Sequence, residues 1–107
     1  MMKFGLHHPN YDFDYMNQNT SQITYNLKKL ATSAEKLGFD SFWIMDHLHQ
    51  IPLVDKPSGP MLESWSILSL LAGITSKIRL GTLMTSIIYH RPSLLAKIAS
   101  TVNVLSN

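Results

Sequence analysis

Cysteine is absent from this chain, and long apolar runs and charge of one sign are scarce. Without cysteine, disulfide frameworks, zinc ribbons and thiol catalysis are excluded. No stretch reaches the roughly 18 apolar residues that span a bilayer, and residues 1–8 lack the apolar segment of a signal peptide. The net charge is only +2 and Lys28–Lys29 is the one adjacent basic pair, so nucleic-acid binding has little support. These absences favour a soluble, cytoplasmic protein.

What the chain does contain is typical of one globular α/β domain. Its 107 residues are 45% hydrophobic and 15% charged. Apolar residues at helical spacing predict helices over 21–37 and 62–73 and from Pro92 to the C-terminus, with Gly38 ending the first. Apolar runs predict strands over 3–8, 40–45 and 78–85. The β-α-β-α-β-α order predicts a parallel sheet. A solenoid would have a similar period, but no motif repeats between the units.

Three stretches of the chain together resemble a known family. They are KFGLHHPNY at 3–11, AEKLGFDSFWIMDHLHQ at 34–50 and SKIRLGTLMTSIIYHRPSLLAKIASTVNVLSN at 76–107. The chain resembles the start of luciferase-like monooxygenases and is most similar to the branch that uses the deazaflavin coenzyme F420. The resemblance implies a partial TIM (β/α)₈ barrel, with residues 1–107 as its three N-terminal βα units. The family usually continues beyond this point into a fourth strand, so more than half of a barrel is expected to be missing.

The pair Asp46–His47, at the end of the second strand, is the first candidate site, because catalytic residues of TIM barrels follow the strand ends. An imidazole exchanges protons near neutral pH, and a neighbouring carboxylate can orient it. A loop-capping Asp beside a solvated His is the alternative. The resemblance implies that His47 and Asp46 are catalytic, with His47 over the cofactor ring and Asp46 also contacting the cofactor. The family's sugar-phosphate dehydrogenases carry a Trp shortly after this pair, whereas this chain has His49, Gln50 and Ile51.

The second candidate is the end of the third strand, formed by Thr82, Leu83, Met84, Thr85 and Ser86. The residues alone indicate an ordinary buried strand. The resemblance implies instead a bulge with a cis peptide bond that does not involve proline, against which the cofactor ring stacks.

The end of the first strand is the third candidate, with His7 and Asn10 as substrate-pocket residues. Alternation puts His7 and His8 on opposite faces of the strand, and we predict that His7 points inward. A metal site is not predicted, because the five histidines show no metal-binding spacing.

Two further segments have weaker signals. Arg91, in Tyr89–His90–Arg91–Pro92, is placed to meet a phosphate at a helix N-terminus or to lie in a solvated loop. In the first loop, Tyr11, Phe13 and Met16 suggest a contact surface.

The resemblance implies a hydride-transfer oxidoreductase or monooxygenase acting on a small molecule, with the ring chemistry supplied by the cofactor. F420 is favoured over FMN because the Asp46–His47 context and residues 59–63 look closest to that branch. The alternative is an inactive truncated fragment. Its open sheet edges would require self-association or a complementary barrel fragment.

Overall fold

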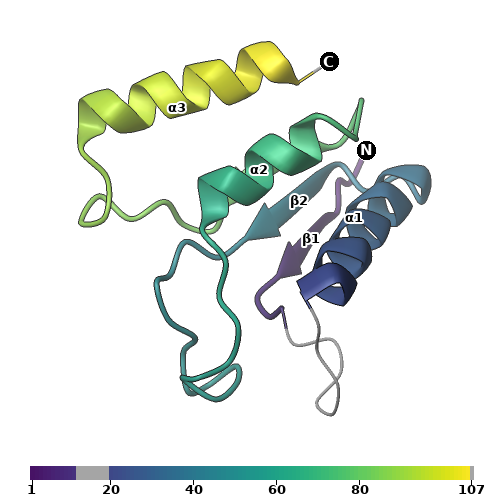
Figure 1. Cartoon of the computed structure of the whole chain (residues 1–107). Helices are drawn as coiled ribbons and strands as arrows, with labels where there is room; N and C mark the ends of the chain where they lie inside the picture. Colours follow the sequence, from purple (N-terminus) through teal and green to yellow (C-terminus); the bar gives the residue numbers. More distant parts are fainter. Residues whose placement is uncertain (12–19, 107) are drawn as a thin grey trace.

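Three strands and three helices alternate along the chain. The computed structural model describes residues 1–11 and 20–106. Its elements are β1 (Gly5–His8), α1 (Thr20–Lys36), β2 (Ser41–Ile44), α2 (Ser64–Ala72), β3 (Arg79–Thr82) and α3 (Pro92–Leu105) (Figure 1). The order and type of every predicted element are confirmed, although each strand is only four residues long. Phe13, Met16 and the rest of 12–19 lie outside the described residues.

The strands form one parallel sheet in the order β1-β2-β3. His7 pairs with Trp43, which in turn pairs with Gly81, so these three residues lie side by side across the sheet. Because neighbouring strands are joined through helices, all three strands end at the same edge of the sheet. The predicted parallel sheet is therefore confirmed.

The core lies between the sheet and the first two helices. Leu27 and Ala31 of α1, Phe42 of β2 and Leu71 of α2 are at most 1% exposed and belong to one cluster. Tyr11 is also fully buried in this cluster, so its prediction as part of a contact surface is wrong. At the end of α1, Gly38 has a φ of 83°, the left-handed conformation expected of a glycine helix stop.

A carboxylate joins α1 to the segment that leads into β3. Glu35 Oε1 accepts hydrogen bonds from the backbone amides of Ser76, Lys77 and Ile78 at 2.7, 2.6 and 3.0 Å. These bonds hold the pKa of Glu35 below its usual value, since each favours the charged form. Glu35 thus sets where the third strand begins relative to the first helix.

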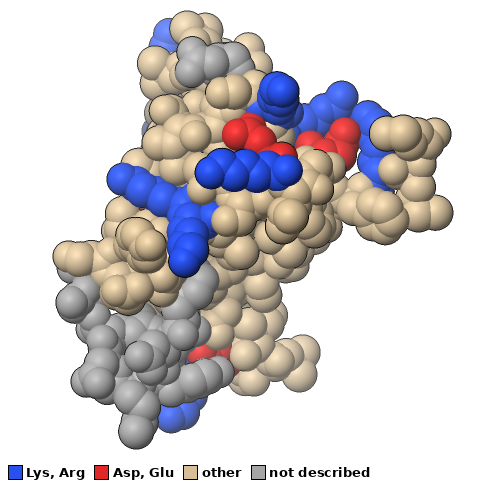
Figure 2. Space-filling view, turned by 90° about the vertical axis from the view of Figure 1, so that its right-hand side faces the viewer, with Lys and Arg blue, Asp and Glu red and all other residues tan. Residues whose placement is uncertain are grey.

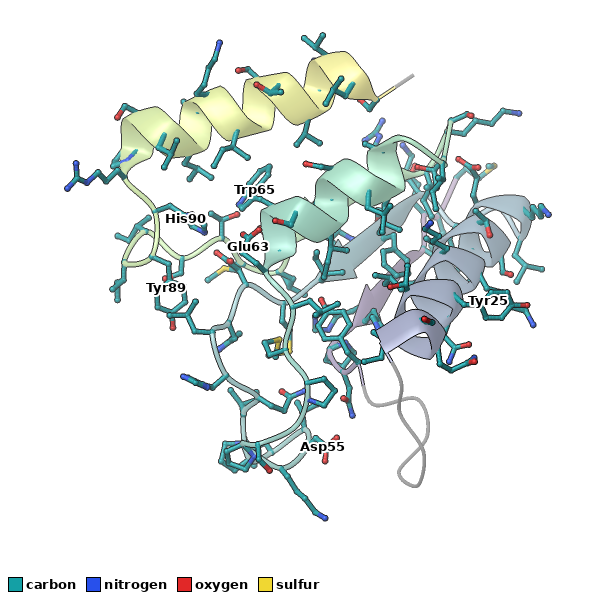
Figure 3. All side chains as sticks on the ribbon, in the orientation of Figure 1. Tyr25, Asp55, Glu63, Trp65, Tyr89 and His90 are labelled. Carbon is teal, nitrogen blue, oxygen red and sulfur yellow. The ribbon has the colours of Figure 1, made fainter. Side chains whose placement is uncertain are left out.

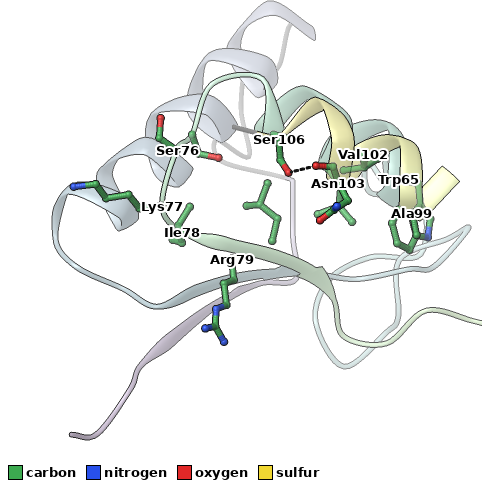
Figure 4. Close-up of a pocket in the computed structure, with 13 residues that line it drawn as sticks. Trp65, Ser76, Lys77, Ile78, Arg79, Ala99, Val102, Asn103 and Ser106 are labelled. Atoms are coloured by element: carbon green, nitrogen blue, oxygen red, sulfur yellow. Dashed lines mark hydrogen bonds between the residues drawn. The ribbon is translucent and has the colours of Figure 1, made fainter. Parts of the chain in front are cut away.

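Within the described residues, the helices cover one face of the sheet and leave the other open. Figure 4 shows Arg79 of β3 pointing away from the helices. On that open face the Trp43 indole lies across its neighbours: a Cβ added at Gly81 would come within 2.7 Å of the ring, and one added at Gly5 within 2.9 Å of Nε1. The two glycines therefore leave the space that the indole occupies.

The last helix is less fully packed than the others. None of the residues of α3, all of which the structure describes, is buried. Between α2, α3 and β3 lies a cavity of about 420 Å³, lined by Trp65, Leu80, Ala99 and Val102 among others (Figure 4). Within residues 1–11 and 20–106, no helix has both the length and the apolar character needed to cross a membrane. On the face drawn in Figure 2, Lys and Arg side chains lie next to Asp and Glu side chains, and Lys3 pairs with Asp40 at 3.1 Å.

Candidate functional site

The three predicted site segments lie together where the strands end. Asn10 follows β1, Asp46 and His47 follow β2, and residues 83–86 follow β3. The backbone amide of Leu83 donates to the carbonyl of Ile44 at 2.8 Å, which continues the strand pairing by one residue. The parallel topology thus brings together segments that are up to 76 residues apart in sequence, from Asn10 to Ser86.

Asp46 is the centre of this region. Its side chain is 6% exposed and accepts hydrogen bonds from Ser64 Oγ and from the amide of Ser86, both at 2.7 Å. His90 Nε2 lies 3.0 Å from Oδ2 of the same carboxylate. Burial by itself raises the pKa of Asp46, but the bonds from Ser86, Ser64 and His90 outweigh it and hold that pKa below its usual value. Asp46 is therefore a buried, ionised carboxylate that binds three segments of the chain.

The segment after β3 has the shape that the family resemblance implied. The Leu83–Met84 peptide bond is cis without proline, and the hydroxyls of Thr82 and Thr85 are in contact. Leu83 and Met84 are 49% and 76% exposed, so the segment presents an apolar surface. The prediction from the residues alone, an ordinary buried strand through Thr85, is wrong because β3 ends at Thr82 and the chain turns there.

His47 lies at this edge of the sheet, after β2. Its side chain is half-buried, and it directly follows Asp46. Among the described residues, the imidazole that pairs with Asp46 is that of His90, 44 positions along the chain. The residue before His47, Asp46, is the one that is bonded to the segment after β3, through the amide of Ser86.

At the end of β1 the two histidines separate as alternation predicts. His7 lies on the open face of the sheet, whereas His8 is 8% exposed and packs against Tyr11 and Phe42. Burial lowers the pKa of His8 to about 4. Asn10 donates from Nδ2 to Asp55 Oδ2 at 2.9 Å, so it connects β1 to the loop over 48–60. Gln50 makes a second connection through the carbonyl of Pro9 at 3.0 Å.

Ser64 and Glu63 were not predicted as site residues, and His90 was predicted only as part of the segment 89–92, in which Arg91 was the candidate side chain. Glu63 caps α2 by accepting from the amides of Trp65 and Ser66. Asp46, Glu63 and His90 each place a ligand atom within 4.8 Å of the others, and Figure 3 shows Glu63 and His90 at the start of α2. Their separation in sequence conceals this cluster, since searches for metal-binding spacing compare close neighbours. Arg91 is exposed and precedes α3 without a side-chain capping bond.

Comparisons with known proteins identify the class. The family model described as luciferase-like monooxygenase matches residues 2–107. The chain belongs to this family.

Its relatives are longer than it is. Uncharacterized proteins of Mycobacterium tuberculosis and Mycobacterium bovis are 31% identical over 91 residues, which cover 72% of this chain and 32% of theirs. The chain thus spans about a third of the length of the curated relatives it matches.

Two solved structures share the fold. The coenzyme F420-dependent tetrahydromethanopterin reductase of Methanopyrus kandleri superposes with a TM-score of 0.69 at 25% identity, over 97% of this chain and 24% of that one. The FMN-bound oxygenating constituent of 3,6-diketocamphane monooxygenase from Pseudomonas putida gives a TM-score of 0.74 at 20% identity, over 98% and 27%. The three βα units are therefore part of a TIM-barrel architecture, as predicted.

Proposed function

We propose that this chain supplies the ring-binding part of a deazaflavin- or flavin-dependent oxidoreductase that acts on a small molecule. The observation that carries the proposal is that His47 and the segment 83–86, in which Leu83 and Met84 are exposed, both follow strand ends at the same edge of the sheet in a chain of the luciferase-like family. The cofactor, when bound, supplies the hydride chemistry.

The residues present fit the face of a flat ring system. Leu83 and Met84 offer apolar side chains to the ring, while Thr82, Thr85 and Ser86 offer polar groups beside them. Sites for organic cofactors commonly combine an apolar surface with a few fixed polar groups. Because Asp46 holds the amide of Ser86, this surface has a fixed position before any ligand binds. Asp46 thus contributes to cofactor binding by supporting the ring surface.

His47 is the proposed catalytic residue. A half-buried imidazole without the carboxylate of Asp46 as partner is available to exchange a proton with a substrate hydroxyl or carbonyl. His7 and Asn10 are proposed to line the adjoining substrate pocket, with Asn10 fixed by Asp55.

F420 is preferred over FMN as the cofactor. The Asp46–His47 context and residues 59–63 resemble the F420-dependent branch, and the reductase from Methanopyrus kandleri shares 25% identity with the chain. FMN is the alternative, supported by the FMN-bound monooxygenase of the same fold.

Titration of the purified chain with F420 and with FMN, followed by the fluorescence of each ligand, tests the proposal. We expect F420 to bind more tightly. Met84→Lys should weaken binding at least about tenfold, because a charge would have to be buried under the ring. The matched control is Leu53→Lys on the 48–60 loop, where Leu53 is 96% exposed. No binding of either ligand, or equal loss in both variants, would overturn the proposal.

A second candidate is that the chain is inactive alone and needs a complementary chain to form a barrel. The unburied α3, the cavity beside it and the open edges of β1 and β3 favour this reading. We propose that this complementary chain supplies the remaining βα units of a luciferase-like barrel.

Sedimentation of the chain alone and with the last five βα units of a family member tests this candidate. A one-to-one complex that binds the cofactor more tightly than the chain alone is expected. A chain that stays monomeric, ignores the added units and binds cofactor by itself would exclude the second candidate.

A further inference from the structure

The segment after β3 is attached at both ends to the end of β2. At its start, the amide of Leu83 donates to the carbonyl of Ile44 at 2.8 Å. At its far end, the amide of Ser86 donates to Asp46 Oδ2 at 2.7 Å. The first attachment is an ordinary backbone pairing, but the second depends on where one side chain points. The position of residues 84–86 is therefore sensitive to whatever orients Asp46.

Two side chains from other elements orient that carboxylate. Ser64 Oγ, at the start of α2, donates to Oδ1 at 2.7 Å and is itself 1% exposed. His90, just before α3, places Nε2 3.0 Å from Oδ2 and 3.3 Å from Oδ1, with its side chain 12% exposed. Hydrogen bonds to a charged, buried acceptor are stronger and more directional than those at the surface. Three segments of the chain thus meet on one carboxylate.

Glu63, the third member of the cluster with Asp46 and His90, does not orient the Asp46 carboxylate. Its oxygens accept from the amides of Trp65 and Ser66 and from the Ser66 hydroxyl, at 3.0, 2.7 and 2.6 Å. Glu63 therefore serves the start of α2, while Ser64 and His90 serve Asp46.

We infer that His90 and Ser64 are positioning residues, which act through Asp46 to hold residues 84–86 where a cofactor ring binds. The last part of this inference rests on the proposed function, whereas the first part, the control of residues 84–86, does not. His90 would act from the side of α2 and α3, where it borders a surface cleft lined also by Glu63, Ser69 and Ile98. Neither residue would touch the ring.

Amide hydrogen exchange at Ser86, measured by NMR without cofactor, tests the control of the segment. We expect His90→Ala and Ser64→Ala each to speed exchange of this amide about three- to tenfold, because one bond that orients its acceptor is lost. His90→Gln, whose side-chain amide can still donate to Asp46, should restore most of the protection. His49→Gln is the matched control, since His49 is exposed. Unchanged Ser86 exchange in both alanine variants, while the chain remains folded, would overturn the inference.

Cofactor titration of the same variants tests the link to ring binding. His90→Ala should weaken binding by a similar factor, and His90→Gln should recover it, if the ring rests on residues 84–86. If the loss of cofactor affinity does not follow the change in Ser86 exchange across the set of variants, the link is refuted. If the unmodified chain binds neither F420 nor FMN, the proposed function fails, yet the exchange measurements still decide whether His90 and Ser64 hold the segment. If His90→Ala does not fold, His90→Gln against Ser64→Ala gives the same comparison.

Discussion

The first and last helices of this chain differ in what they bury. α1 places Leu27, Ala31 and Ala34 in the core, each at most 2% exposed, and Glu35 connects its end to the start of β3. α3 buries none of its residues and leaves a cavity between itself, α2 and β3. Helix stability in proteins comes mainly from such packing, so the same kind of amphipathic sequence has different consequences in the two places. The stability of the chain should therefore depend much more on the packing of α1 than on that of α3.

Truncating one leucine in each helix tests this difference between α1 and α3 most directly. Leu27→Ala should lower the free energy of unfolding by about 2–5 kcal/mol, because Leu27 is 1% exposed and its removal leaves a cavity. Leu94→Ala on α3, where Leu94 is 55% exposed, should change it by less than about 0.5 kcal/mol. Urea unfolding followed by circular dichroism measures both. Equal losses would show that α3 is packed as tightly as α1.

Acid should destabilise the folded chain through His8, at the end of β1. Burial lowers the pKa of His8 to about 4, from 6.5 in the unfolded chain, so the unfolded state binds a proton first as pH falls. Stability from this group is therefore complete above about pH 6.5 and decreases towards pH 4, by at most about 3 kcal/mol. His8→Phe should flatten this part of the pH dependence of unfolding, whereas His49→Phe should leave it unchanged. A profile that is the same in all three chains would contradict the prediction.

Loss of the Glu35 connection between α1 and residues 76–78 should have a smaller effect on stability. Glu35→Gln keeps an acceptor for the amides of Ser76, Lys77 and Ile78 but removes its charge, and should cost about 1 kcal/mol at neutral pH. Because the pKa of Glu35 is lowered in the folded chain, its contribution is present above the unfolded pKa and is lost as pH falls through the folded value. The variant and the parent chain should thus converge in stability at low pH. A constant difference at all pH values would argue against this role.

The sequence was sufficient for the elements, because local patterns determine them. The apolar spacing of 21–37, the Gly38 stop and Pro92 at the start of α3 each depend on neighbouring residues. Alternation also separated His7 from His8, though it could not show that His8 would pack against Tyr11. Burial of Tyr11 depends on helices far along the chain.

The network around Asp46 could not be predicted in the same way. Its partners Ser64, Ser86 and His90 lie 18, 40 and 44 residues away, and none of the intervening loops has a pattern that fixes their geometry. Pairing Asp46 with His47 was the natural expectation, since the two are adjacent. Adjacent side chains after a strand diverge, however, and the carboxylate meets an imidazole brought in by the third βα unit instead.

Trp43 makes the open face of the sheet observable by tryptophan fluorescence. Its indole, 36% exposed, lies between Gly5 and Gly81 on the side that none of the described helices covers, while Trp65 lies between β3 and the helices on the other. A ligand or a second chain that covers that face would dehydrate Trp43 and shift its emission to shorter wavelength, so binding at this face could be followed by intrinsic fluorescence.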